Sequence, residues 1–144
     1  MATNLHKKYT ESLTREWEVP AGTKSGDYVI HAESGQVGVA LTDRGDETGP
    51  ANIAGVTGGT VPTGGVGNKP TGAVVAVDGS WRFTIEGADD GETVAGSGTA
   101  AGTAVYAGSD AQTVTLTSGS DQIGVIDDCN IVDGVGAILI GAVL

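Results

Sequence analysis

Short runs rich in Val, Ile, Thr and aromatic residues alternate along the chain with runs of Gly, Asp, Ser and Pro. From Ser25 onward the apolar runs are DYVIHA, QVGVALT, ANIAGVT, GAVVAVDG, SWRFTIEG, TAVYAG, QTVTLTS, QIGVIDD and GAILIGAVL. Turn-forming sequences such as ESG, DRGDETGP, GADDGET and SGSD separate them. Short β-rich runs bounded in this way are typical of strands joined by tight turns. The pattern predicts an all-β fold, either a small β-barrel or a β-sandwich with glycine-rich turns.

The run SWRFTIEG shows the clearest alternation of apolar and polar residues. In a strand, Trp81, Phe83 and Ile85 would point to one face and the polar residues between them to the other. The C-terminal run adds Ile138 and Ile140, which indicate a buried final strand. We expect these five residues to form either the core of the domain or a contact surface between subunits.

Two stretches of the sequence share an order of features. Residues 25–43, SGDYVIHAESGQVGVALTD, and residues 101–128, AGTAVYAGSDAQTVTLTSGSDQIGVIDD, each run from a Tyr-containing apolar segment through a turn to a second apolar segment that contains a glycine. The glycines are Gly38 and Gly124. One interpretation is two related strand–turn–strand units that face each other, with the glycine allowing the sheet to bend. The other is chance similarity between low-complexity stretches.

The segment from Gly58 to Gly72 is rich in glycine and contains Pro62 and Pro70. Proline cannot donate a hydrogen bond to a sheet, so this segment is unsuited to a central strand. We expect a long, mobile loop at about residues 58–72.

Residues 1–24 differ in composition from the rest of the chain, and we expect them to form an extended N-terminal arm ahead of a single β domain at residues 25–144. The arm contains four of the seven basic residues and a single large apolar anchor, Trp17. Pro20 ends any helix that could begin in this region. Two roles for Trp17 are left open: it packs on its own domain, or it docks on a partner or a neighbouring subunit.

The formal net charge of −11 is unevenly distributed. Only Arg44, Lys69 and Arg82 supply positive charge beyond residue 25, so the body of the protein is strongly acidic. An acidic surface repels phosphate backbones, and we therefore expect a protein partner and no nucleic acid.

No combination of residues in the sequence is typical of a catalytic or metal site. TGGVGNKPTG lacks the Gly-Lys-Ser/Thr ending of a phosphate-binding loop. The acidic turns DRGDE and GADDGE lack the ligand spacing of a calcium loop, and adjacent carboxylates in a turn diverge. His6 and His31 have no neighbouring nucleophile, and the lone Cys129 is best interpreted as a small buried residue. We expect no enzymatic activity, no metal and no cofactor.

The chain ends offer no membrane signal. MATNLHKKYTES lacks the apolar run of a signal peptide, and VGAILIGAVL is too short to span a bilayer. We expect no membrane association, and a protein that is made and kept in the cytoplasm or in something assembled there.

The order of these segments resembles that of the small capsid decoration, or cement, proteins of tailed bacteriophages. The resemblance is carried by MATNLHKKYTES, by SGDYVIHAESGQVGVALTD, by GAVVAVDGSWRFTIEGADDGETVAGSGTAAGTAVYAG and by QIGVIDDCNIVDGVGAILIGAVL. It spans nearly the whole chain, and the Gly/Pro-rich segment and the longer arm depart from it.

The resemblance implies a structural protein that binds the outer surface of the mature icosahedral head. It implies trimers at three-fold and quasi-three-fold positions, the major capsid protein as partner, and a place in the virion. We expect the N-terminal arm to contact the capsid through Lys7, Lys8, Tyr9, Arg15 and Trp17.

A carbohydrate-binding β module of a virion fibre or surface protein is the alternative. It requires an exposed aromatic platform, for which the sequence offers Trp17, Trp81, Phe83 and three tyrosines.

Overall fold

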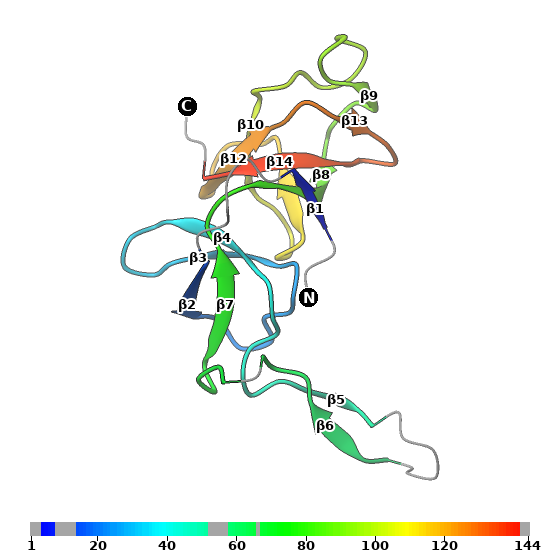
Figure 1. Cartoon of the computed structure of the whole chain (residues 1–144). Coiled ribbons are helices and arrows are strands. Elements are labelled where there is room, and N and C mark those ends of the chain that lie inside the picture. Colours follow the sequence, from blue (N-terminus) through cyan, green and yellow to red (C-terminus); the bar gives the residue numbers. More distant parts are fainter. Residues whose placement is uncertain (1–3, 8–13, 52–57, 66, 142–144) are drawn as a thin grey trace.

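A computed structural model describes residues 4–7, 14–51, 58–65 and 67–141 of the chain. The prediction of an all-β fold is confirmed: fourteen strands and no helix form across these residues (Figure 1). The part of the chain that is described accordingly contains no helix with the length and apolar character needed to cross a membrane.

Five strands close into a small barrel. They are β8 (Ser80–Glu86), β11 (Thr113–Thr115), β10 (Ala104–Ala107), β12 (Gln122–Ile126) and β14 (Val135–Ile140), in that spatial order. Pairing of β14 with β8, from Val135↔Thr84 to Leu139↔Ser80, closes the ring. The β8–β11 pair is parallel and the other pairs are antiparallel. The barrel decides between the two architectures that the sequence left open.

The barrel interior is filled by the alternating apolar residues of β8 and their neighbours. Trp81, Phe83 and Ile85 are 3%, 2% and 2% exposed, and Ile138 and Ile140 are 0% and 5% exposed. All five belong to one hydrophobic cluster. The structure places these five residues in the core, which is one of the two roles predicted for them, so a trimer contact would have to use other residues.

A second, four-stranded antiparallel sheet lies beside the barrel. Its spatial order is β2 (Thr14–Glu18), β7 (Gly72–Ala76), β4 (Val37–Ala40) and β3 (Tyr28–Ile30). One face supplies Val37, Val39 and Ala76 to the barrel cluster. The opposite face forms a smaller cluster of its own, made of Trp17, Val19, Val29, Ala73 and Val75. The sheet is therefore joined to the barrel through an apolar face.

Two short antiparallel ribbons complete the fold. β9 (Gly91–Glu92) pairs with β13 (Asn130–Ile131) next to the barrel. β5 (Thr48–Pro50) pairs with β6 (Thr60–Pro62), and this ribbon extends away from both the barrel and the four-stranded sheet (Figure 1).

The prediction of an N-terminal arm outside the β domain is corrected by the structure. β1 (Leu5–Lys7) pairs with the start of β8, and β2 forms an edge of the four-stranded sheet through five paired positions with β7. Asn4 also donates to the carbonyl oxygens of Gly26 and Arg82, which joins this segment to both sheets. The composition of the segment differs from the body, but its backbone finds hydrogen-bond partners in strands far along the chain.

The prediction of a long loop at residues 58–72 is corrected in part, because the segment is not loop throughout. The segment contains β6, because both prolines lie where no ladder donor is needed: Pro62 is at the end of a two-stranded ribbon and Pro70 precedes β7. Both of the similar stretches of sequence contain an antiparallel strand pair, β3–β4 and β10–β12, one in each sheet, but in the second stretch the connection between the two strands contains β11.

Candidate interaction surface

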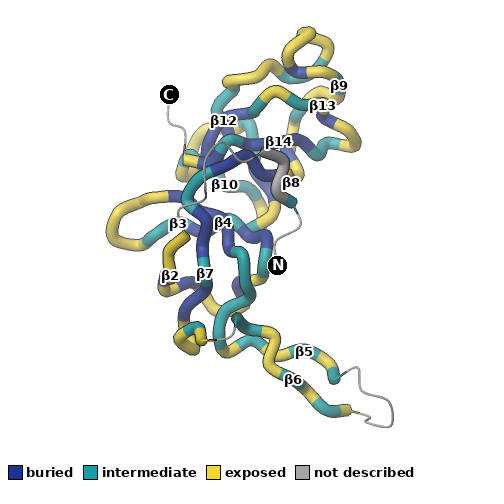
Figure 2. Tube along the Cα trace, viewed as in Figure 1, coloured by how far each residue is buried: buried dark blue, intermediate teal, exposed yellow. Residues whose placement is uncertain are grey.

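The ribbon made by β5 and β6 is the most protruding described feature of the molecule. Both strands show the burial order exposed, half-buried, exposed. Figure 2 shows the ribbon as yellow and teal along its described length, without the dark blue of the buried core. Neither hydrophobic cluster includes a residue of the ribbon. It therefore contributes surface rather than core.

One face of this ribbon is built from two threonines and two prolines. Thr48 pairs with Pro62, and Pro50 pairs with Thr60. Directly paired residues, and residues two apart in a strand, point to the same face. Thr48, Pro50, Thr60 and Pro62 are all exposed, and we call this surface the Thr-Pro face.

The same prolines remove hydrogen-bond donors from the outer edges of the ribbon. The N–H of Thr63 donates to the carbonyl oxygen of Glu47 at 2.8 Å, and that of Ala51 donates to the carbonyl oxygen of Gly59 at 2.9 Å. In an antiparallel pair, residues whose backbone N–H and C=O groups point to the partner strand alternate with residues whose groups point away from it. The backbone nitrogens of Pro50 and Pro62 therefore point away from the ribbon. Each edge thereby loses a donor that an added strand would need.

The ribbon leaves the body at residues 43–47 and 63–64, which we call its base, and backbone hydrogen bonds join this base to the body. The carbonyl oxygen of Glu47 accepts from Thr63 and Gly64, while the N–H of Gly45 donates to the carbonyl oxygen of Gly72 at 2.9 Å. Asp43 and Gly64 form a further β-bridge. The direction in which the ribbon leaves the body is therefore set by several independent contacts.

Glycine is required at the base because backbones approach closely there. A Cβ on Gly45 would lie 2.1 Å from the carbonyl oxygen of Lys69, and one on Gly64 would lie 2.5 Å from that of Arg44. Neither distance is compatible with a side chain, so these positions depend on close backbone packing rather than on a turn conformation.

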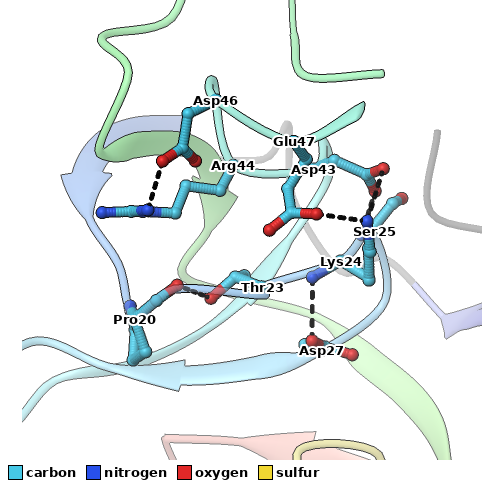
Figure 3. A network of polar contacts seen from close by, with 9 residues as sticks. All are labelled: Pro20, Thr23, Lys24, Ser25, Asp27, Asp43, Arg44, Asp46 and Glu47. Carbon is cyan, nitrogen blue, oxygen red and sulfur yellow. Dashed lines mark hydrogen bonds and ion pairs between the residues drawn. The ribbon is translucent and has the colours of Figure 1, made fainter. Parts of the chain in front are cut away.

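Charged side chains reinforce the base from the loop that precedes β3 (Figure 3). The Lys24 Nζ lies 2.6 Å from the Glu47 Oε2 and 3.8 Å from the Asp43 Oδ2. The Asp43 Oδ1 accepts from the Ser25 N–H at 2.8 Å. The hydrogen bond to Glu47, together with the nearby carboxylates, raises the pKa of Lys24 above its ordinary value.

A second ion pair lies within the turn at residues 43–47, which leads into β5. The Arg44 Nη1 is 2.6 Å from the Asp46 Oδ2 (Figure 3). The acidic turn DRGDE, whose sequence lacks the ligand spacing of a calcium loop, thus has its three carboxylates engaged by Lys24, Ser25 and Arg44. Over the described residues, no group of three or more His, Cys, Asp or Glu is placed to hold a metal ion.

The other acidic turn, GADDGE, is also used structurally. The Asp90 carboxylate accepts from the N–H groups of Asp133 and Gly134, at 3.1 and 3.0 Å. Asp133 has a positive φ of 52°, in the tight turn before β14. A carboxylate that caps this turn stabilises a backbone conformation that costs free energy for a residue other than glycine.

Of the five residues predicted to contact a capsid, the structure describes Lys7, Arg15 and Trp17. Lys7 lies in β1, whereas Lys8 and Tyr9 lie outside the described residues. Arg15 is exposed on the edge strand β2. Trp17 is only 7% exposed, and its ring centroid lies 5.0 Å from that of His31. Trp17 therefore packs on its own domain, the first of its two predicted roles.

The aromatic residues offered for a sugar-binding platform are largely unavailable. Trp81 and Phe83 lie inside the barrel, and Trp17 lies in the second cluster. Tyr28 and Tyr106 are half-buried, and Tyr28 packs edge-on against Phe83 with the ring centroids 5.9 Å apart. The rings of Trp17, Trp81 and Phe83 therefore cannot stack on a sugar.

Two surface cavities lie where the four-stranded sheet meets the barrel. One, of about 420 Å³, is lined in part by Pro20, Tyr28, Ile30 and Gly108. The other, of about 340 Å³, is lined in part by Asn4, Arg82 and Gln112. The Gln112 side chain donates to the Asp27 Oδ1 at 2.9 Å across this junction. These polar contacts join the two sheets.

A signal for the ribbon is present in the sequence but differs from the patterns of the first subsection. Residues 48–68 are the longest stretch of the chain without a charged side chain. Within it, TGP at 48–50 and TVP at 60–62 repeat the same spacing of Thr and Pro. The repeat places like residues on one face only when the two segments pair in this register, which the sequence did not reveal.

Comparison with known proteins finds no similarity to this chain: no family model matches it, and no curated protein or solved structure matches it.

Proposed function

We propose that this chain is a capsid decoration protein of a tailed bacteriophage. It binds the outer surface of the mature icosahedral head as trimers at three-fold and quasi-three-fold positions, and it stabilises the contacts between major capsid proteins. Its place is the virion, and it reaches the head in the host cytoplasm during assembly.

The observation that carries the proposal is the uncharged ribbon on an otherwise acidic β body. The body from Ser25 onward has few basic residues, so it repels acidic neighbours and stays soluble. The ribbon extends away from that body, and its base is held by backbone hydrogen bonds and ion pairs. Such an element is suited to contact with another protein.

The segments that carry the resemblance to decoration proteins support the proposal from a second direction. They contain the strand pairs β3–β4 and β10–β12 and every barrel strand except β11, and an apolar sheet face joins the barrel to the second sheet. A decoration protein works through repeated modest contacts whose summed burial and avidity hold a lattice together.

Co-sedimentation with heads tests the function directly. The purified protein is mixed with undecorated expanded heads and, separately, with unexpanded proheads of the matching phage. We expect saturable binding to expanded heads and none to proheads. Absence of binding to both would contradict the proposed function.

A further inference from the structure

We infer that the Thr-Pro face, made of Thr48, Pro50, Thr60 and Pro62, is the surface that docks on the assembled capsid lattice. This inference rests on the proposed function and deepens it, because it names the contacting face and the kind of contact. It replaces the N-terminal segment as the capsid-binding element.

The N-terminal segment is unsuited to that role because its described part is committed to the fold. β2 is paired with β7 at five positions, and its one large apolar side chain, Trp17, is buried in the second cluster. A segment that supplies a strand and a core residue cannot also leave the body to cover a neighbour.

The Thr-Pro face is rigid before it binds. The proline ring has almost no rotamer freedom to lose, and threonine is restricted at its first side-chain torsion. The base holds the ribbon through Glu47, Gly64 and the Lys24 ion pairs. Docking of such a face costs little conformational entropy, so even a small contact contributes net affinity.

The contact uses the face of the ribbon rather than its edges. The backbone nitrogens of Pro50 and Pro62 point outward at the two edges and supply no N–H to an added strand, while their rings lie on the Thr-Pro face. The two edges are thus protected against pairing with another copy of the ribbon, while the Thr-Pro face stays exposed.

The size of the face identifies a lattice rather than a single free partner. A stable pairwise complex buries about 800 Å² per partner, which takes about 20–30 residues on each side. Four Thr and Pro side chains are far too few for that. The trimer of the proposed function presents three linked copies of the face to a lattice of repeated sites, so several weak contacts act together and give strong binding. A second copy of this chain in solution offers no such multiplicity.

The absence of charge in the stretch 48–68 predicts how the contact responds to charge and salt. Docking of an uncharged face gains little from long-range attraction, so its affinity should vary weakly with ionic strength. A charge of either sign placed on the face would be buried without a partner and would weaken binding.

The test compares three single variants with the wild-type chain in binding to undecorated expanded heads. Thr60→Asp and Thr60→Lys place opposite charges on the Thr-Pro face. Thr63→Lys is the matched control, because Thr63 is also exposed but belongs to the opposite face of the ribbon. Thermal unfolding followed by tryptophan fluorescence establishes that each variant retains the fold.

We expect both Thr60 variants to bind at least about tenfold more weakly than wild type, and Thr63→Lys to bind within about threefold of it. If wild type binds and both Thr60 variants bind equally well, the inference is wrong while the proposed function stands. Opposite effects of Asp and Lys would also overturn it, since they would indicate long-range attraction.

Two further results would overturn the inference by other routes. If wild type binds no heads at all, the proposed function fails and the inference fails with it. If light scattering shows that the wild-type chain forms a dimer without heads, and Thr60→Asp and Thr60→Lys abolish that dimer, the occupant of the face is a second copy of this chain.

Discussion

Gly124 lies in β12 where the backbone of β14 comes unusually close. It pairs with Ile140, and a Cβ at this position would lie 2.1 Å from the carbonyl oxygen of Leu139. Gly38 has the matching place in the other strand–turn–strand unit, and a Cβ there would lie 2.3 Å from the Cγ1 of Val75. Both glycines are therefore needed for close packing, in addition to any bend that they allow.

Gly124→Ala should destabilise the protein by about 1–3 kcal/mol or more, because the added methyl group has no space and β14 would have to shift. Urea unfolding followed by far-UV circular dichroism measures the loss. Thr117→Ala, at an exposed loop position, is the control and should change the free energy of unfolding by less than about 0.5 kcal/mol. Equal stability of the two variants would contradict the close packing of β12 and β14.

Tyr28 is the residue whose ionisation should be visible in stability. Burial raises the pKa of its hydroxyl above the ordinary value of 10.0. A folded-state pKa above the unfolded value means that the stabilisation is fully present below pH 10.0 and is lost as the pH rises through the folded-state pKa.

We therefore expect the free energy of unfolding to fall more steeply above pH 10.0 in wild type than in Tyr28→Phe. Absorbance titration of the phenolates should show a transition at high pH that the variant lacks. Parallel stability profiles for the two chains would show that Tyr28 is not the group responsible.

At the scale of elements, the pairing of β2 with β7 gives the N-terminal segment a role in the fold, where the sequence predicted a role in binding. Its burial pattern leaves only Trp17 inside, packed with Val19, Val29 and Val75 against β7 and β4. Deletion of residues 1–20 would remove this strand as well as β1. Loss of head binding by such a truncation would therefore report loss of structure rather than loss of a contact.

Trp17→Ala should cost about 3–5 kcal/mol of stability, the range for removing a buried aromatic side chain. Arg15→Ala, in the same strand but exposed, should cost less than about 0.5 kcal/mol. Chemical denaturation of both variants checks the difference. A Trp17→Ala variant as stable as wild type would mean that the second cluster does not depend on this ring.

A substitution at the base of the ribbon should loosen the ribbon without loosening the barrel. Gly64→Ala would bring a Cβ to 2.5 Å from the carbonyl oxygen of Arg44, so the base would have to open. We expect faster hydrogen exchange at the amides of Ala51 and Thr63, with unchanged exchange in β8. Thr60→Ala, which adds no atom at the base, serves as the control. Unchanged exchange at both ribbon amides would show that the base tolerates the methyl group.

For the whole molecule, the two hydrophobic clusters share the four-stranded sheet. Val39 of β4 faces the barrel cluster, while Val75 of the adjacent β7 faces the second cluster. The contact between Gln112 and Asp27 adds a polar link between the sheets. A sheet buried on one face against the barrel should not unfold separately from it.

Unfolding of the two sheets should therefore occur in one transition. Trp17→Phe leaves Trp81 as a fluorescent probe of the barrel, and Trp81→Phe leaves Trp17 as a probe of the sheet. In each variant the fluorescence midpoint in urea should coincide with the circular dichroism midpoint. Separate midpoints for fluorescence and circular dichroism in either variant would show that the sheets are independent units.

The sequence by itself determined the local structure of this protein. The alternation of Trp81, Phe83 and Ile85 with polar residues predicted both the strand and its buried face, because side chains of a strand alternate whatever its partner. The glycine-rich turns and the apolar C-terminal run were enough to predict an all-β fold. Charge along the chain showed an acidic body, since charge needs no fold to be counted.

Only the tertiary structure decided which strands pair. The closure of β8 on β14, the parallel β8–β11 pair and the place of β2 beside β7 all join residues far apart in the chain, as in Thr14↔Ala76. A two-residue period is the same for every partner, so it carries no information on pairing. For the same reason, only the register in which β5 pairs with β6 brought two Thr-x-Pro segments onto one face and made a surface of them.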